Sequence, residues 1–537
     1  MTFFSKLLNR IQQLHAALFF SYDEKMALLK IKNRFEAYGS KTVTSPFVVV
    51  IEGIVCMKFI AIYYSFLLLL LQFKSGRKVQ VVLLCGNQRT RYFSASRVYK
   101  FFFPVTYVCL DSYLDEDALA VVERETLLLA KQINDPTELF NLSYKGVRVG
   151  RDVYYACIRN RLVGTLDVID SQLVDVLRQY IQNLLIAETL IEKFKPECLL
   201  VTDNCYASFS PFFYGFLRQQ IPVALTVCFA SETGKIGGRI YVSMQNIDSV
   251  MRRYTFAFDD VTWDEIRKNY SAADDEIVDS YLEQRFSGND LTYNGDYHKY
   301  TSKLSYESMR RKLRLSESKL NKKVLIAAHL LWDDPGYEGL YRDYELWLKD
   351  TLSTIVQNTA VTWILKAHPS EKHIGTSKTA RQVFTDIFGD ALPAHICFLD
   401  SDTDINTYSL IDFVDTVLTV RGTIGFEAAC KGKHVVSAGY GPFSGLGFAK
   451  EFSDQVEYRN YLLNLHHEET FLKAEQIRNA RMGLFGYFIK KTPVSPILLR
   501  GEEISKYADL TTFELNSDLT LNRFADKILS KTSGDLL

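Results

Sequence analysis

The segment from Thr419 to Val436, TVRGTIGFEAACKGKHVV, combines residue types that can bind phosphate. A β-rich run ends at Arg421, Gly422 and Thr423, and a helical pattern follows. The start of a helix presents unpaired backbone N–H groups and a partial positive charge, which attract phosphate. Gly422 lets the backbone approach a ligand closely. The Thr423 hydroxyl either caps the helix or binds a phosphate oxygen, and many strand-to-helix turns look alike.

A second candidate follows the strand-like run VTWILK, which ends at Lys366. The next residues include His368 and Pro369, and a proline biases the preceding residue to an extended backbone. An imidazole at the carboxyl end of a strand can donate a hydrogen bond to a phosphate oxygen. The alternative is an ordinary loop histidine. Lys366, His368 and Arg421 are therefore predicted to stabilise negative charge on a departing phosphate.

A third group follows the run VLIAAH and consists of His329, Asp333 and Asp334. Paired aspartates bind a metal, position a sugar hydroxyl or cap the next helix. We name His329 and Asp334 as candidate catalytic residues. The first half of the chain adds two carboxylates, Asp203 after the strand-like run CLLVT and Glu232 in the glycine-rich stretch ASETGKIGG. A general base that activates an acceptor hydroxyl would be a carboxylate or a histidine.

These residues must be positioned by strands, and strand-like runs alternate with helical patterns along most of the chain. Such alternation predicts α/β folding, with parallel, doubly wound sheets and right-handed crossovers. We predict two Rossmann-like domains that face a cleft at the carboxyl ends of their strands. The predicted divisions are an N-terminal helical extension (1–45), a first Rossmann-like domain (46–290), a linker (291–323), a second Rossmann-like domain (324–490) and a C-terminal tail (491–537).

The stretch from Ile54 to Phe73, IVCMKFIAIYYSFLLLLLQF, is apolar enough to cross a bilayer. It lies between two predicted strands, however, and a helix that crosses over a parallel sheet can be equally apolar. Basic residues flank both ends, so the charge bias of a simple membrane span is absent. A buried crossover helix and a membrane contact both remain open.

Composition narrows the class of protein. The chain has 537 residues, with 63 Lys and Arg against 63 Asp and Glu, so overall charge gives no case for binding nucleic acid. Its nine cysteines form no Cys-x-x-Cys pair, and several lie in apolar runs, which fits a reducing cytosol. The N-terminal segment lacks a signal-peptide cleavage site. These features predict a cytoplasmic protein.

Two motifs, KAHPSE from Lys366 to Glu371 and TVRGTIGFEAACKGKHVVSAGYGPFSGLGF from Thr419 to Phe448, resemble bacterial capsule and surface-polysaccharide biosynthesis proteins. Those proteins include Kdo transferases, which resemble GT-B glycosyltransferases. The resemblance implies a GT-B-like fold in which His368 and Thr423 contact the phosphates of a donor nucleotide. It also implies that Glu427 holds the ribose. Lys366, Arg421 and Gly422 complete the predicted donor site.

The resemblance implies a glycosyltransferase that transfers sugar from a nucleotide-activated donor, CMP- or UDP-linked, to a growing capsule or lipopolysaccharide glycan. The acceptor would be a glycan or a lipid-linked glycan, and the enzyme would work in the cytoplasm or peripherally at the inner face of the cytoplasmic membrane. We predict no cofactor beyond this co-substrate and no metal. The alternatives are a nucleotide-sugar epimerase or hydrolase on the same fold, and a non-catalytic glycan-assembly protein.

Overall fold

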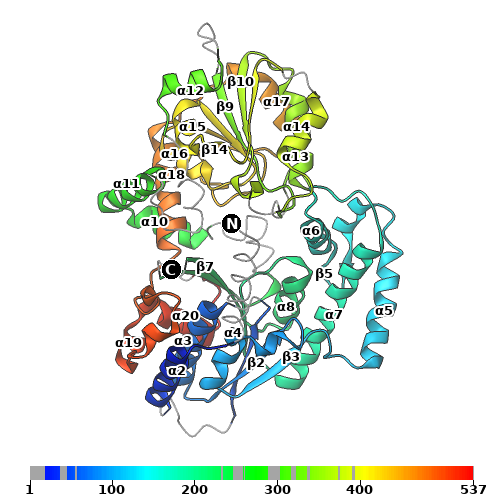
Figure 1. The fold of residues 1–537 in the computed structure, drawn as a ribbon, viewed down its shortest axis with the longest axis vertical. Coiled ribbons are helices and arrows are strands. Elements are labelled where there is room, and N and C mark those ends of the chain that lie inside the picture. The colour runs from blue at the N-terminus through cyan, green and yellow to red at the C-terminus, as the bar shows by residue number, and fades with distance from the viewer. Residues whose placement is uncertain are drawn as a thin grey trace, which may run out of the picture.

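The computed structural model describes residues 19–36, 45–54, 57–230, 234–245, 258, 260–287, 303–315, 322–334, 339–372, 375–389 and 393–535. These residues form two lobes, each built on its own sheet with helices on both faces (Figure 1). The fold is therefore α/β with two Rossmann-like lobes, as the alternation of strands and helices predicts.

The sheet of the first lobe runs in the order β15-β8-β7-β6-β1-β2-β3. Its central strands are parallel, whereas β8 pairs antiparallel with β7, and β15 antiparallel with β8. The strand order reverses between the neighbouring central strands β1 and β6. The carboxyl ends of these two strands therefore form the switch point of the lobe. The strands are β1 (Phe47–Glu52), β2 (Val79–Cys85), β3 (Val105–Cys109), β6 (Cys198–Val201), β7 (Val223–Ala230), β8 (Lys235–Tyr241) and β15 (Gly534–Asp535).

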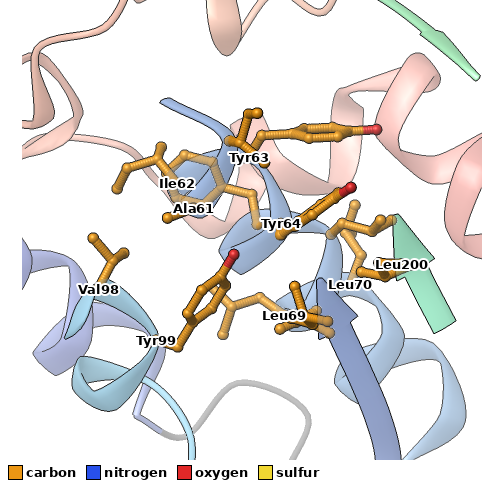
Figure 2. Close-up of a cluster of buried hydrophobic side chains, with 14 of the residues drawn as sticks. Ala61, Ile62, Tyr63, Tyr64, Leu69, Leu70, Val98, Tyr99 and Leu200 are labelled. Atoms are coloured by element: carbon orange, nitrogen blue, oxygen red, sulfur yellow. The ribbon is translucent and has the colours of Figure 1, made fainter. Parts of the chain in front are cut away.

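The apolar stretch after β1 forms α3 (Lys58–Ser75), a helix inside the first lobe (Figure 2). All of residues 59–71 are buried. The hydroxyl oxygens of Tyr64 and Thr226 lie 2.5 Å apart. Among the described residues α3 is the one helix long and apolar enough to span a membrane, and 72% of that window lies buried. The structure thus favours the crossover-helix interpretation, because α3 already packs against protein along most of its length.

Helices cover both faces of the first sheet. Helix α3 shares one face with α2 (Tyr22–Phe35), α4 (Ser94–Val98) and α20 (Leu519–Ser530). The opposite face carries α5 (Glu116–Ala130), α6 (Gly150–Arg161), α7 (Ser171–Phe194) and α8 (Tyr206–Arg218). A two-strand hairpin, β4 (Ser143–Tyr144) and β5 (Val147–Arg148), precedes α6.

The second lobe has an all-parallel sheet in the order β11-β10-β9-β12-β13-β14. The order reverses between β9 and β12 at the centre of the sheet. The strands are β9 (Lys322–Ala327), β10 (Val361–Lys366), β11 (Ile396–Leu399), β12 (Thr416–Thr419), β13 (His434–Ser437) and β14 (Ala449–Lys450). The helices are α12 (Tyr306–Lys312), α13 (Tyr344–Ile355), α14 (Ala380–Phe388), α15 (Thr407–Phe413), α16 (Ile424–Cys430), α17 (Gln455–Asn464) and α18 (Ala474–Phe485).

The structure corrects the predicted division at 290. Helices α10 (Asp260–Asn269) and α11 (Ala272–Ser287) were assigned to the first domain, but their buried residues pack in a core of the second lobe with residues of α16 and α18. A polar helix carries little signal about which core receives its few apolar residues. The division at 290 is therefore wrong, because this pair of helices belongs to the second lobe.

The predicted tail from 491 onward also proves to be part of a core. After α18 the chain crosses back to the first lobe, where α19 (Thr512–Ser517) and α20 are followed by β15. Phe524 of α20 stacks on Tyr63 of α3 with ring centroids 6.3 Å apart. The apolar face of α20 is buried against α3 in the core of the first lobe. Both ends of the described chain therefore lie in that lobe (Figure 1).

Candidate active site

A cavity of about 180 Å³ lies at the switch point of the second lobe. The chain leaves β9, β10 and β12 there, so the loops after these strands supply most of its walls, and ligands of doubly wound sheets bind at this position. The polar and glycine residues of the lining are Arg285, His329, Lys366, His368, Thr407, Tyr408, Thr419, Gly422, Thr423 and Glu427. The structure thus brings together six of the predicted site residues.

Lys366 ends β10, and its side chain is nearly buried, with 7% exposed. Burial lowers the pKa of Lys366 to about 8, because an ammonium loses hydration that the protein only partly replaces. The residue remains mostly protonated at neutral pH. A buried cation in the wall of a cavity favours an anionic ligand.

His368 stands two residues beyond Lys366. Burial, followed by the charge of Lys366, lowers the pKa of His368 to about 4, so the imidazole is neutral at pH 7. The backbone N–H of Ser370 donates to His368 Nδ1 at 3.1 Å. Nδ1 is therefore an acceptor, which leaves the proton on Nε2. His368 thus offers an N–H donor rather than a second positive charge.

The turn before α16 differs in part from its prediction. Thr423 precedes the helix, and its side chain makes no capping hydrogen bond, so capping does not occupy its hydroxyl. Gly422 donates its N–H to Thr419 Oγ1 at 3.1 Å, and a Cβ at Gly422 would lie 2.8 Å from that oxygen. The glycine is thus required for packing within the turn. Helix α16 has only seven residues, so the side chains carry more of the case for phosphate binding than its dipole does.

His329 lines the cavity, and its ring also forms contacts that stabilise the turn after β12. The N–H of Val420 donates to His329 Nε2 at 3.3 Å, and Thr419 Oγ1 lies 3.0 Å from the same nitrogen. The ring also stacks on Tyr344, with centroids 4.3 Å apart. Burial is the main cause that lowers the pKa of His329 well below its usual value. The geometry fits a residue that positions the turn, and the catalytic role stays a prediction.

Glu427 stands one turn beyond Thr423 on α16 and lies in the cavity wall. Its Oε1 is 2.7 Å from Nε of Arg285, and the two side chains are only 4% and 7% exposed. Arg285 comes from α11 and was missed by the sequence analysis. Its position in a polar helix far from any motif gave no signal, because only packing of α11 against the second lobe brings it to the cavity. Arg421 lies outside the lining.

Asp334 lies at the contact between the lobes. Arg151 of α6 donates to both of its carboxylate oxygens at 3.1 and 3.0 Å, and the pair is nearly buried, with side chains 11% and 7% exposed. Nearby, Tyr206 donates its hydroxyl proton to Asp333 at 3.1 Å. Asp334 is not among the cavity-lining residues, so these contacts show a carboxylate engaged in joining the lobes, and its catalytic role stays a prediction.

Asp203 lies just beyond β6, at the switch point of the first lobe. Its carboxylate accepts the N–H of Cys205 at 2.9 Å, and burial raises its pKa to about 6. Glu52 ends the neighbouring strand β1, is 3% exposed and accepts the Thr202 hydroxyl proton at 2.6 Å. Glu52 was not among the predicted site residues, although a carboxylate that ends a buried strand was a usable signal. Glu232, the other predicted carboxylate, lies outside the described residues.

Within the described ranges, no group of three or more His, Cys, Asp or Glu side chains is arranged to hold a metal ion. The cavity instead offers a buried ammonium, a neutral imidazole N–H donor, a hydroxyl and a carboxylate. This set can hold a phosphate through charge and hydrogen bonds and a polyhydroxyl group through the carboxylate.

Comparison with known proteins bears on the same part of the chain. Residues 300–467 match the family of capsule polysaccharide biosynthesis proteins, which confirms the resemblance for this region. No curated protein matches.

Similar solved structures include the beta Kdo 2,4 transferase KpsC of Thermosulfurimonas dismutans, with 12% identity, a TM-score of 0.32, and coverage of 53% of this chain and 79% of that chain. The structure of S. aureus MnaA with UDP has 12% identity and a TM-score of 0.30, and the match covers 91% of this chain and 97% of that chain. The alpha,alpha-trehalose 6-phosphate synthase of Burkholderia multivorans has 11% identity and a TM-score of 0.33, and the match covers 91% of this chain and 99% of that chain. At such scores these likenesses carry no argument about chemistry.

Proposed function

We propose that the protein is a glycosyltransferase of surface-polysaccharide synthesis that binds a nucleotide-activated sugar in the cavity of the second lobe. One observation carries the proposal: Lys366, His368, Thr423 and Glu427 line a single cavity at the switch point of that lobe. The match of residues 300–467 to capsule polysaccharide biosynthesis proteins supports the choice of pathway. The proposed donor is CMP- or UDP-linked.

In this proposal the phosphate lies between Lys366 and His368. The buried ammonium supplies positive charge, and His368 Nε2–H donates a hydrogen bond without adding a charge. The Thr423 hydroxyl, which also lines the cavity, donates a further hydrogen bond. Charge that develops on the departing phosphate is stabilised by these fixed donors, so we propose a mechanism that needs no metal ion. Glu427 accepts hydrogen bonds from the ribose hydroxyls.

The acceptor approaches from the first lobe, and Asp203 is the proposed general base. A carboxylate with a pKa of about 6 is ionised at neutral pH yet basic enough to share the proton of an attacking hydroxyl. The acceptor is a glycan or a lipid-linked glycan, and we place the reaction in the cytoplasm, with peripheral contact at the inner face of the membrane. Glu52 is the second carboxylate at this edge and provides a comparison variant.

The test begins with binding. A thermal-shift screen with CMP, UDP, GDP and their sugar conjugates should raise the melting temperature for one nucleotide class, because a ligand bound only to the folded state stabilises it. Transfer of the sugar from the stabilising donor to a surface-glycan acceptor is then measured. Release of a free or epimerised sugar without acceptor would support the hydrolase or epimerase alternative, and absence of any turnover would support a non-catalytic protein.

The His368→Ala variant should abolish transfer with little change in melting temperature. The exposed His467 gives a matched control, and His467→Ala should retain full activity. An active His368→Ala enzyme would contradict the assignment of the cavity. Asp203→Asn should lower the rate of transfer while leaving donor binding intact, and Glu52→Gln shows whether the neighbouring carboxylate carries that role instead.

A further inference from the structure

Tyr206 has an unusual backbone conformation at a point where the first lobe contacts the second. It begins α8, three residues after Asp203, and its φ is +65°. Left-handed backbone is unfavourable for a residue with a bulky side chain, because the Cβ crowds the following carbonyl oxygen. Such a conformation persists where the surrounding contacts fix it. The contacts of the Tyr206 side chain therefore indicate what the conformation serves.

The hydroxyl group of Tyr206 joins the two lobes. It donates to Oδ1 of Asp333 at 3.1 Å and accepts a hydrogen bond from Nη1 of Arg159 at 2.7 Å. Arg159 belongs to α6 of the first lobe, whereas Asp333 follows β9 of the second. The hydroxyl thus acts as donor and acceptor at once, and it fixes a loop of the second lobe against two helices of the first.

Arg159 is held by aromatic rings from both lobes. Its guanidinium carbon lies 4.7 Å from the ring centroid of Tyr206 and 5.4 Å from that of Trp332. Its Nη1 is also 3.5 Å from Oδ1 of Asp333. Cation–π attraction and the ion pair therefore support the hydrogen bonds of the hydroxyl. We call Arg159, Tyr206, Trp332 and Asp333 the interlobe cluster.

Both sides of the interlobe cluster adjoin groups of the proposed reaction. In the first lobe, Asp203 accepts the N–H of Cys205 at 2.9 Å, so the proposed base lies in the same short turn as Tyr206. In the second lobe, the loop that carries Asp333 begins with residues that line the donor cavity, including His329. The cluster therefore connects the turn of the proposed base to a loop that borders the donor cavity.

We propose that Tyr206 is a positioning residue that, through its hydrogen bond to Asp333, aligns Asp203 with the donor held in the second lobe. This inference rests on the proposed function, because it names what places the proposed base. A base must lie within hydrogen-bond reach of the acceptor hydroxyl, and a displacement of about 1 Å can slow a reaction about a hundredfold. Tyr206 does not line the donor cavity, so loss of its hydroxyl should lower turnover and leave nucleotide binding unchanged.

The experiment compares two tyrosines whose hydroxyls each donate to an aspartate of the other lobe. Tyr206→Phe keeps the ring and should lower kcat about tenfold or more, measured with the donor that the thermal-shift screen selects. Its Kd for CMP and UDP, measured by titration calorimetry, should equal that of wild type. Tyr154 of α6 donates to Asp343 at 2.7 Å and gives the matched control. Tyr154→Phe should lower the melting temperature and keep the wild-type kcat.

A double-mutant cycle tests whether the two partners act through one contact. Asp333→Ala removes the acceptor of the same hydrogen bond, and this partly exposed residue gives a second variant that should fold. Adding Tyr206→Phe to Asp333→Ala should cause little further loss of kcat, because the hydrogen bond is already absent. Losses that multiply in the double variant would overturn the inference. So would a wild-type kcat in Tyr206→Phe, weaker binding of CMP and UDP by that variant, or an equal loss of kcat in Tyr154→Phe.

Failure of the proposed function gives a different result. A wild-type protein that transfers no sugar refutes the function and the inference with it. A wild-type protein that transfers sugar, beside an Asp203→Asn variant of undiminished kcat, refutes the role of the base and the inference but leaves the glycosyltransferase function in place.

Discussion

Replacing Lys366 by methionine should make the protein more stable while it weakens phosphate binding. The pKa of Lys366 falls from 10.5 to about 8 on burial, and at about 1.4 kcal/mol for each unit this corresponds to about 3 kcal/mol. The folded-state pKa lies below the unfolded one, so the charged lysine is disfavoured in the fold. The full cost is present below pH 8 and disappears as the pH rises from 8 to 10.5, because the folded protein then holds the lysine neutral. Methionine has similar length and no charge.

Urea unfolding followed by tryptophan fluorescence measures this effect at pH 7 and at pH 10. We expect Lys366→Met to raise the free energy of unfolding by about 3 kcal/mol at pH 7 and by clearly less at pH 10. Lys372 is exposed at the end of the short 3-10 helix Pro369–Lys372, and Lys372→Met should stay within about 0.5 kcal/mol of wild type. Destabilisation at pH 7, or a gain that does not change with pH, would refute the view that Lys366 is an unfavourably buried cation kept for a ligand.

Four further outcomes are expected. Affinity for a phosphate-bearing nucleotide should fall as the pH rises above 8, because Lys366 loses its proton, and the Lys366→Met variant should lack this dependence in a calorimetric titration. His329→Phe should lower the free energy of unfolding by about 1–3 kcal/mol through the lost contacts to the β12 turn; an unchanged denaturation midpoint would argue against a positioning role. Asp334→Asn should cost about 3–5 kcal/mol by removing the carboxylate that pairs with the buried Arg151, and Arg151→Met in the same chain should recover part of that loss. Carbonate washing should release the protein completely from membranes, because α3 lies in a protein core; retention in the pellet would contradict that placement.

The strands and their order along the chain could be predicted from sequence because buried parallel strands read as continuous β-branched and apolar runs. β10 has the predicted bounds Val361–Lys366. β8 was not predicted, since its sequence KIGGRIY contains two glycines. Its pairing with β7 overrides the weak local preference of glycine for strands.

Part of the cavity lining was predictable for a related reason. Lys366, His368 and Thr423 follow predicted strands, and the carboxyl ends of parallel strands meet at one edge of a sheet. The roles of His329 and Asp334 could not be assigned in the same way. Both residues follow β9. The ring of His329, however, accepts a hydrogen bond from the turn after β12, whereas the carboxylate of Asp334 pairs with Arg151 of the first lobe. Sequence order gives the loop but not the direction of each side chain within it.

The sequence by itself determined that the chain makes two doubly wound lobes and that residues of types able to bind phosphate follow the strands of the second. Periodicity and strand-end chemistry are local properties, so they can be read along the chain. Only the tertiary structure decided that α11 belongs to the second lobe, that the last helices return to the first, and that Arg285 meets Glu427. Those outcomes depend on which apolar faces bury each other across more than a hundred residues, and no local pattern records such a pairing.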